Sequence, residues 1–111
     1  MEVLNFDEKI IANYIEAIRP PAEVRKSVDL GYSFTEKEVV LFEIRPSLIE
    51  TNRLNHYPFV KAKYIKAHKH WKIYWMSATD KWELYGHTPT VRDLADFVQV
   101  VEDDEMGCFR G

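Results

Sequence analysis

Cysteine is nearly absent from this sequence, and its scarcity limits both the class of protein and its compartment. Cys108 is the only cysteine among the 111 residues, so no disulfide can form within one chain. Small secreted domains are commonly held together by several disulfides, whereas a single thiol fits a reducing compartment. We therefore expect a cytoplasmic protein that is stabilised by a hydrophobic core.

Long hydrophobic runs are also missing. No stretch approaches the roughly 20 consecutive apolar residues that a membrane helix requires. Residues 1–8 lack the basic side chains and the long apolar segment of a secretion signal. We expect a soluble, intracellular chain with no membrane partner.

Neither sign of charge dominates the composition. The formal net charge is −3 at pH 7, which argues against a general nucleic-acid binder. The hydrophobic share of 46% and the aromatic share of 14% are typical of globular proteins. A chain of this length buries enough surface for one core. We therefore expect a single domain that spans residues 1–111.

Two segments have the spacing of amphipathic helices. Asn5 and Glu8 form a capping pattern that predicts a helix start, and Pro20 ends that helix because proline donates no backbone hydrogen bond. A second helix is predicted to begin at Thr90, with Phe97 beside its buried stripe. The apolar face of the first helix comprises Phe6, Ile10, Ile11, Tyr14, Ile15 and Ile18. That of the second comprises Val91, Leu94, Ala95, Val98 and Val101.

Between these helices the apolar period changes to two residues, which predicts β-strands with one buried face. The expected strands are residues 27–34, 39–45, 59–65, 71–76 and 82–85. Pro46 to Pro58 is expected to be irregular, with Asn52, Arg53, His56 and Tyr57 as its polar candidates. The predicted fold class is α+β: an antiparallel four- to five-stranded sheet with an N-terminal and a C-terminal helix packed on one face.

The alternation also assigns side chains to the two faces of the sheet. Val40, Phe42 and Ile44 are expected to face the core in the second strand. The residues Trp71, Trp75, Trp82 and Leu84 are expected to be buried with them. The other face stays open, and it becomes a candidate interface if it carries Leu41, Tyr74, Met76 and Tyr85.

A basic run in the third and fourth strands gives the sharpest functional signal. The segment from Lys61 to Lys72 contains lysines and histidines but no acid. If these strands pair, the lysines and a tyrosine share one exposed face that could bind an acidic protein or stack single-stranded nucleic acid. The predicted binding residues are Lys61, Lys63, His70, Lys72 and Tyr74.

The basic run could instead serve one of two structural purposes. Exposed strands often carry lysine because its charge prevents aggregation. The acidic carboxyl-terminal region could also cover the lysines of the same chain, or those of a second copy in a homodimer. That region comprises Asp93, Asp96, Glu102, Asp103, Asp104 and Glu105.

Several strings in the sequence together resemble a known family. They are residues 40–46, 60–64, 71–75, 80–82 and 107–111, and the likeness extends over nearly the whole chain from about Pro20 onward. The chain is similar to small bacterial proteins grouped as domain of unknown function 3024. The resemblance implies no activity, cofactor or site residue. It also implies two departures, because that family usually has an arginine where this chain has Ser77 and a histidine where it has Glu83.

No motif commits the sequence to a reaction, so a non-enzymatic binding module is the leading hypothesis and no catalytic residue or cofactor is predicted. The alternative is a metal-dependent, nuclease-like hydrolase. Such enzymes hold Mg²⁺ with an Asp on one strand and a Glu on the next, which here would be Asp29 and Glu43. Arg45 stands where those enzymes have lysine, and arginine cannot act as a neutral base.

The histidines and the cysteine are expected to have ordinary structural roles. His68 and His70 could ligate a metal with His56 and His87, but the lysines around them disfavour a cation, so no metal site is predicted. Cys108 is expected to be a small buried residue that docks the tail together with its neighbour in sequence, rather than a nucleophile.

Overall fold

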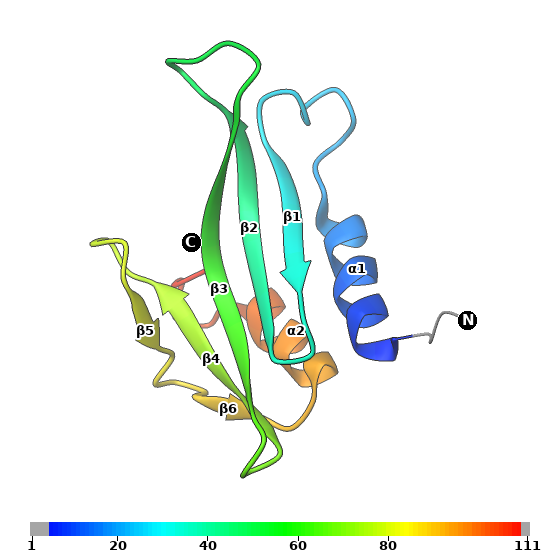
Figure 1. The fold of residues 1–111 in the computed structure, drawn as a ribbon, viewed down its shortest axis with the longest axis vertical. Helices are drawn as coiled ribbons and strands as arrows, with labels where there is room; N and C mark the ends of the chain where they lie inside the picture. The colour runs from blue at the N-terminus through cyan, green and yellow to red at the C-terminus, as the bar shows by residue number, and fades with distance from the viewer. Residues whose placement is uncertain (1–4, 110–111) are drawn as a thin grey trace.

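The computed structural model describes residues 5–109, which form an α+β fold (Figure 1). In chain order the elements are α1 (Phe6–Ile18), β1 (Asp29–Phe34), β2 (Glu38–Pro46), β3 (Leu54–Ile65), β4 (His70–Met76), β5 (Trp82–Leu84), β6 (Thr90–Val91) and α2 (Leu94–Asp103). The predicted fold class is confirmed, with six strands in the sheet.

The sheet is antiparallel at every pairing between these strands. Its order is β1-β2-β3-β4-β5, and β6 pairs with β4 beyond the end of β5. In Figure 1, α2 lies behind the middle of the sheet and α1 lies along the outer side of β1. The sheet thus has a helix side and, facing the viewer, an open side.

The sequence of α1 explains both of its ends. The Asn5 side chain accepts hydrogen bonds from the backbone N–H groups of Asp7 and Glu8, as the capping pattern predicts. The helix ends at Ile18, shortly before the two prolines of the following segment. Ile11 and Ile15 are buried as expected. Phe6, however, is 70% exposed, because it precedes the part of the helix that packs on the sheet.

The second helix begins later than predicted. Asp93, not Thr90, caps α2 by accepting a hydrogen bond from the Asp96 N–H. Thr90 and Val91 instead form β6, because the edge of β4 is open opposite Lys72. The buried residues of α2 are Leu94, Phe97 and Val101, whereas the predicted Ala95 is exposed.

The faces of β2 are the reverse of those predicted. Val39 and Leu41 are fully buried on the helix side, so Val40 and Phe42 lie on the open side. Residues 39–42 are all apolar, so no polar residue marks which face meets water. A β-bulge in β3 adds to the difference, since Leu41 pairs with Val60 but the next residue, Phe42, pairs with Pro58.

The segment from Pro46 to Pro58 is far more regular than expected. Both strands continue into it, so that only residues 47–53 form a turn. His56 and Tyr57, predicted in a loop, lie in β3. We call residues 42–58 the arm, a β-hairpin whose outer part, beyond the residues that pair with β1, projects from the body at the top of Figure 1. The prolines are tolerated because they lie at a strand end and where β3 has no partner on its outer edge among the described strands.

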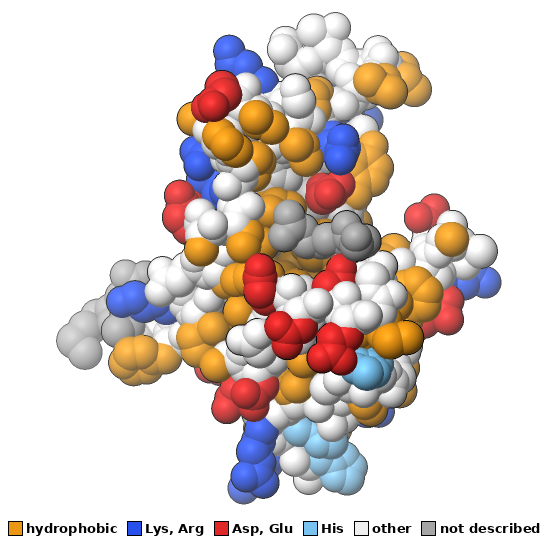
Figure 2. Space-filling view, turned by 180° about the vertical axis from the view of Figure 1, so that it is seen from behind, with side chains coloured by type: hydrophobic (Ala, Val, Ile, Leu, Met, Phe, Trp, Pro, Cys, Tyr) orange, Lys and Arg blue, Asp and Glu red, His pale blue; other side chains and the backbone are white. Residues whose placement is uncertain are grey.

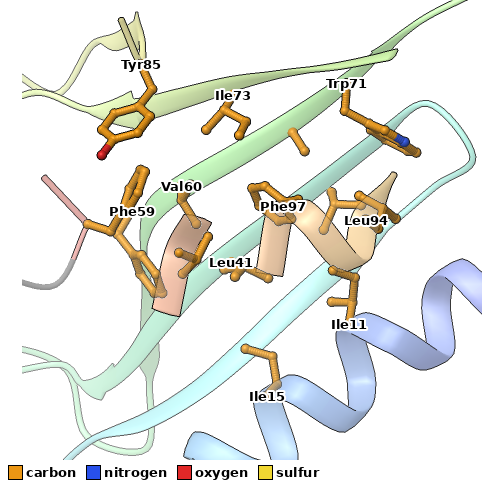
Figure 3. Close-up of a cluster of buried hydrophobic side chains, with 14 of the residues drawn as sticks. Ile11, Ile15, Leu41, Phe59, Val60, Trp71, Ile73, Tyr85, Leu94 and Phe97 are labelled. Carbon is orange, nitrogen blue, oxygen red and sulfur yellow. The ribbon is translucent and has the colours of Figure 1, made fainter. Parts of the chain in front are cut away.

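The hydrophobic core fills the space between the sheet and both helices (Figure 3). Trp71 is buried in it, and Trp75 packs against it half-buried. Leu41 and Tyr85, predicted on the open face, are buried at 0% and 2% exposure. Figure 3 shows Phe97 of α2 pointing toward the strands, between Leu41 and Leu94.

Candidate functional site

Two rows of side chains cross the open side of the sheet, as the strand register shows. Each residue in a row lies directly opposite the next, with Cβ atoms ~5 Å apart. The first row is Val40, Lys61, Tyr74 and Leu84. The second is Glu38, Lys63, Lys72 and Thr90. Lys61, Lys63, Lys72 and Tyr74, together with Trp82, form what we call the basic-aromatic face.

Lys61 forms cation–π contacts with two aromatic rings. Its Nζ lies 5.1 Å from the centroid of the Tyr74 ring and 4.7 Å from that of Trp82. Each such cation–π contact contributes about 0.5–1 kcal/mol at a partly exposed site. The rings therefore favour this position of the ammonium group at the surface.

Trp82 belongs to the open side, contrary to the prediction that it is buried in the core. It is half-buried and lies opposite Met76, while Leu84, also predicted inward, is 48% exposed. The strand β5 has only three residues, too few for alternation to define its inner face. Tyr85, just after the strand, is the residue that enters the core. Sequence reasoning therefore missed the second aromatic group of the face.

Lys63 and Lys72 lie directly opposite each other on neighbouring strands. Like charges in this arrangement destabilise a sheet unless an anion lies between or above them. Within residues 5–109, no ion pair involves Lys61, Lys63 or Lys72. Glu38 is the strand partner of Lys63 on the other side, yet the two side chains do not form an ion pair. Neither ammonium group therefore has an anionic side-chain partner in the described part of the chain.

His70 extends this surface toward the β3–β4 turn. It has the same parity in β4 as Lys72, and its ring stacks on that of His68 with centroids 5.4 Å apart. Its Nε2 atom is buried and has no hydrogen-bond partner in the described part of the chain. Because this nitrogen is shielded from solvent, a molecule on the surface would meet the rest of the ring and not this atom.

The acidic carboxyl-terminal region lies on the other side of the molecule. Figure 2, seen from behind, shows acidic side chains gathered on the helix side. Several of them have partners there: Glu102 accepts from the Tyr14 hydroxyl, Asp103 from the Gln99 amide, and Glu105 contacts His87. This region therefore does not cover the lysines of its own chain.

The structure does not bring the proposed hydrolase residues together. Asp29 pairs with Ile44 and Leu30 pairs with Glu43, so Asp29 and Glu43 lie on opposite faces of the sheet. Glu43 forms an ion pair with Arg45. The prediction of a shared metal-binding site at these two acids is wrong, because it counted strand positions without the register.

Asp29 has a structural role instead. Its two carboxylate oxygens accept hydrogen bonds from Arg19, at 3.0 Å from Nε and 2.8 Å from Nη2. This bidentate contact lowers the pKa of Asp29 and raises that of Arg19. It ties the end of α1 to the start of β1.

The histidines do not gather around a common point. His56 stacks on Phe42 with centroids 4.4 Å apart, and His87 contacts Glu105. In the described residues no group of three or more His, Cys, Asp and Glu side chains is arranged to hold a metal ion. Nor does any described helix have the length and apolar character needed to cross a membrane.

The tail docks through Phe109, as predicted, but Cys108 is less buried than expected. Phe109 is buried and packs on Tyr85 with ring centroids 4.7 Å apart, and the neighbouring Cys108 is half-buried. Burial, together with the charge of Asp104, raises the pKa of the Cys108 thiol. A protonated thiol is a poor nucleophile, which fits a packing role.

Comparison with known proteins identifies a family but no characterised relative. Neither a curated protein nor a solved structure matches the chain. The family resemblance seen in the sequence is confirmed over its full length. Since the family model matches residues 2–111, the chain belongs to the family described as Domain of unknown function (DUF3024).

Proposed function

We propose that this protein is a non-enzymatic binding module whose basic-aromatic face receives an acidic segment of another protein. One observation carries the proposal: Lys63 and Lys72 lie opposite each other on a helix-free sheet surface, without an ion pair in the described structure. An acidic partner would relieve this repulsion. Lys61, already oriented by two rings, would supply a third positive group.

Protection against aggregation accounts less well for these lysines. Lysine serves that purpose on edge strands, whose backbone groups are free to pair with another chain. Here Lys61 and Lys63 lie in β3, between β2 and β4, and Lys72 lies in β4, between β3 and the β5 and β6 strands. Interior strands have no free backbone edge at these positions, so the charges need another reason.

An acidic protein fits this face better than single-stranded nucleic acid. Base stacking needs an aromatic ring with a free face, but the Lys61 ammonium already lies over Tyr74 and Trp82. The exposed Leu84 belongs to the first row, and the half-buried Met76 lies opposite Trp82. Both could contact apolar residues of a peptide.

A matched pair of double variants tests the proposal. We expect Lys63→Ala with Lys72→Ala to weaken binding of a fluorescent, glutamate-rich peptide that contains a few leucines. Exposed ion pairs contribute about 0.2–1 kcal/mol each, so the loss of two corresponds to about two- to thirtyfold in the dissociation constant. The control is Lys9→Ala with Lys26→Ala, two exposed lysines in α1 and before β1, which changes the formal charge by the same amount.

The measurement is fluorescence anisotropy at several salt concentrations. Support consists of binding that weakens with added salt, weakens further in the Lys63/Lys72 variant and is unchanged in the control. Equal losses in both variants would show that only net charge matters, and would overturn the assignment of the face. A fluorescently labelled single-stranded oligonucleotide that binds while the peptide does not would overturn the choice of partner.

A further inference from the structure

The arm has one apolar face and one polar face, although it lies outside the core. Across its two strands Phe42 pairs with Pro58, Ile44 with His56 and Pro46 with Leu54. Partners in a register share a face, so these side chains form one uncharged stripe on the open side of the sheet. We call this set, Phe42, Ile44, Pro46, Leu54, His56 and Pro58, the apolar stripe.

The opposite face of the arm shows that this division is not simply a result of apolar composition. It carries Glu43 opposite Tyr57 and Arg45 opposite Asn55. Glu43 and Arg45 form an ion pair, and the Asn55 amide donates to the Tyr57 hydroxyl at 3.4 Å. The polar side chains of this face have partners and tolerate contact with water, whereas the apolar stripe exposes hydrophobic surface.

The end of the arm is the most exposed apolar part of the described chain. Leu48 and Ile49 in the turn are 103% and 94% exposed, and Leu54 is 62% exposed. Figure 2 shows hydrophobic side chains at this end of the molecule. Beyond Ile44 the arm has no third strand from β1, and a two-stranded hairpin is marginally stable in water unless its apolar side is covered.

A groove lies at the base of the same stripe. It has a volume of about 400 Å³ and runs between α1 and β1, with Ala12, Arg19, Gly31, Phe42, Ile44 and His56 among its lining residues. Gly31 forms its floor, where a Cβ atom would lie only 2.8 Å from the Phe42 ring. One surface thus offers an apolar projection and a mainly apolar recess, whose lining also includes the paired charges of Glu16 and Arg19.

We propose that two copies of this chain pair through their arms. The copies would lie antiparallel, with the apolar stripes in contact and the Leu48–Ile49 tip of each over the groove of the other. The distance from the Ile44 and His56 rung to the tip is about 15 Å, because a strand rises ~3.3 Å per residue. Reciprocal docking of this kind is isologous and closes at a dimer, whereas one-way insertion would give open fibres.

The partner is a second copy because the stripe is complementary to itself. It carries no Lys, Arg, Asp or Glu, so two copies meet without charge repulsion. Pairing through the basic-aromatic face would instead oppose two sets of lysines. The two surfaces share no residue, which leaves the basic-aromatic face free in the dimer and makes this proposal independent of the proposed function.

Two single variants in β3 separate the faces of the arm. Leu54→Glu places a charge on the apolar stripe, and Tyr57→Glu places the same charge on the polar face. Both residues are exposed, at 62% and 49%, but Tyr57→Glu faces Glu43 across the strands, so circular dichroism must first verify that both variants fold. Sedimentation velocity over a range of concentrations gives the dimer dissociation constant. We expect Leu54→Glu to weaken the dimer by about a hundredfold or more and Tyr57→Glu to change it by no more than about threefold.

Cross-linking adds a geometric test. In the antiparallel arrangement Leu54 lies midway between tip and groove, close to the two-fold axis. In a Cys108→Ser background, mild oxidation should therefore link two copies of Leu54→Cys but not two copies of Tyr57→Cys. The proposal is overturned if the wild-type chain stays monomeric throughout, if both Glu variants weaken the dimer equally, or if Tyr57→Cys cross-links as well as Leu54→Cys. A dimer that persists as salt rises supports the apolar contact.

Discussion

Two phenylalanines test whether the core lies where the structure places it. Phe97 is completely buried in α2, and Phe6 is 70% exposed at the start of α1. Truncating a buried phenylalanine to alanine removes its transfer free energy and leaves a cavity, at a cost of about 3–5 kcal/mol. An exposed site away from special contacts changes stability by about 0.5 kcal/mol or less. We therefore expect Phe97→Ala to be strongly destabilising and Phe6→Ala to be nearly neutral.

The size of this difference makes it easy to measure. Domains of this kind have unfolding free energies of about 5–15 kcal/mol, so Phe97→Ala would remove a large fraction of the total. Urea unfolding followed by circular dichroism gives the free energy of unfolding and the m-value for each variant. Equal losses at Phe6 and Phe97 would show that the two helices do not pack as described. So would a Phe97→Ala variant as stable as the wild type.

Two further substitutions probe the elements around the arm. Because Arg19 lowers the pKa of Asp29 below its ordinary 3.8, the folded state gains stability above that pH and loses it as pH falls through the lowered value. Asp29→Asn should therefore be less stable than the wild type at pH 7 and lose less stability on acidification, as urea midpoints from neutral to acidic pH would show. A midpoint-versus-pH curve parallel to the wild type would contradict this. Gly31→Ala should cost about 1–2 kcal/mol and shift the NMR signals of Phe42 and His56, since the new Cβ displaces the Phe42 ring; unchanged signals and stability would argue against the close contact.

The helices and the central strands could be predicted because their sequence marks both faces. In α1 the cap at Asn5 and the apolar residues spaced three and four apart both indicate a helix. In β3 and β4, Lys61, Lys63 and Lys72 alternate with buried residues and so define the outer face. The placement of these three lysines on one side of the sheet followed from that pattern.

The predictions failed where the local sequence lacks such marks. In β2 the run from Val39 to Phe42 is apolar on both faces, so this segment alone does not show which face is buried. The apolar side chains on the open side belong with those of the arm, and the bulge in β3 shifts the register there. Pro46 and Pro58 suggested an irregular segment, although proline is compatible with strand ends and free edges. Trp82 was assigned inward from a strand of three residues. In each case the deciding information lies in a neighbouring strand, which the sequence of one segment does not contain.

The three tryptophans provide the most direct test of the basic-aromatic face. Trp82 lies half-buried on the open side, whereas Trp71 is 4% exposed in the core between the sheet and the helices. Each indole N–H gives a separate signal in a ¹H–¹⁵N NMR spectrum, which can be recorded as the glutamate-rich peptide is added. Our account predicts that the Trp82 signal shifts in a saturable, salt-sensitive manner while the Trp71 signal stays in place. A titration in which peptide binds but Trp82 does not move, or in which Trp71 moves instead, would contradict it.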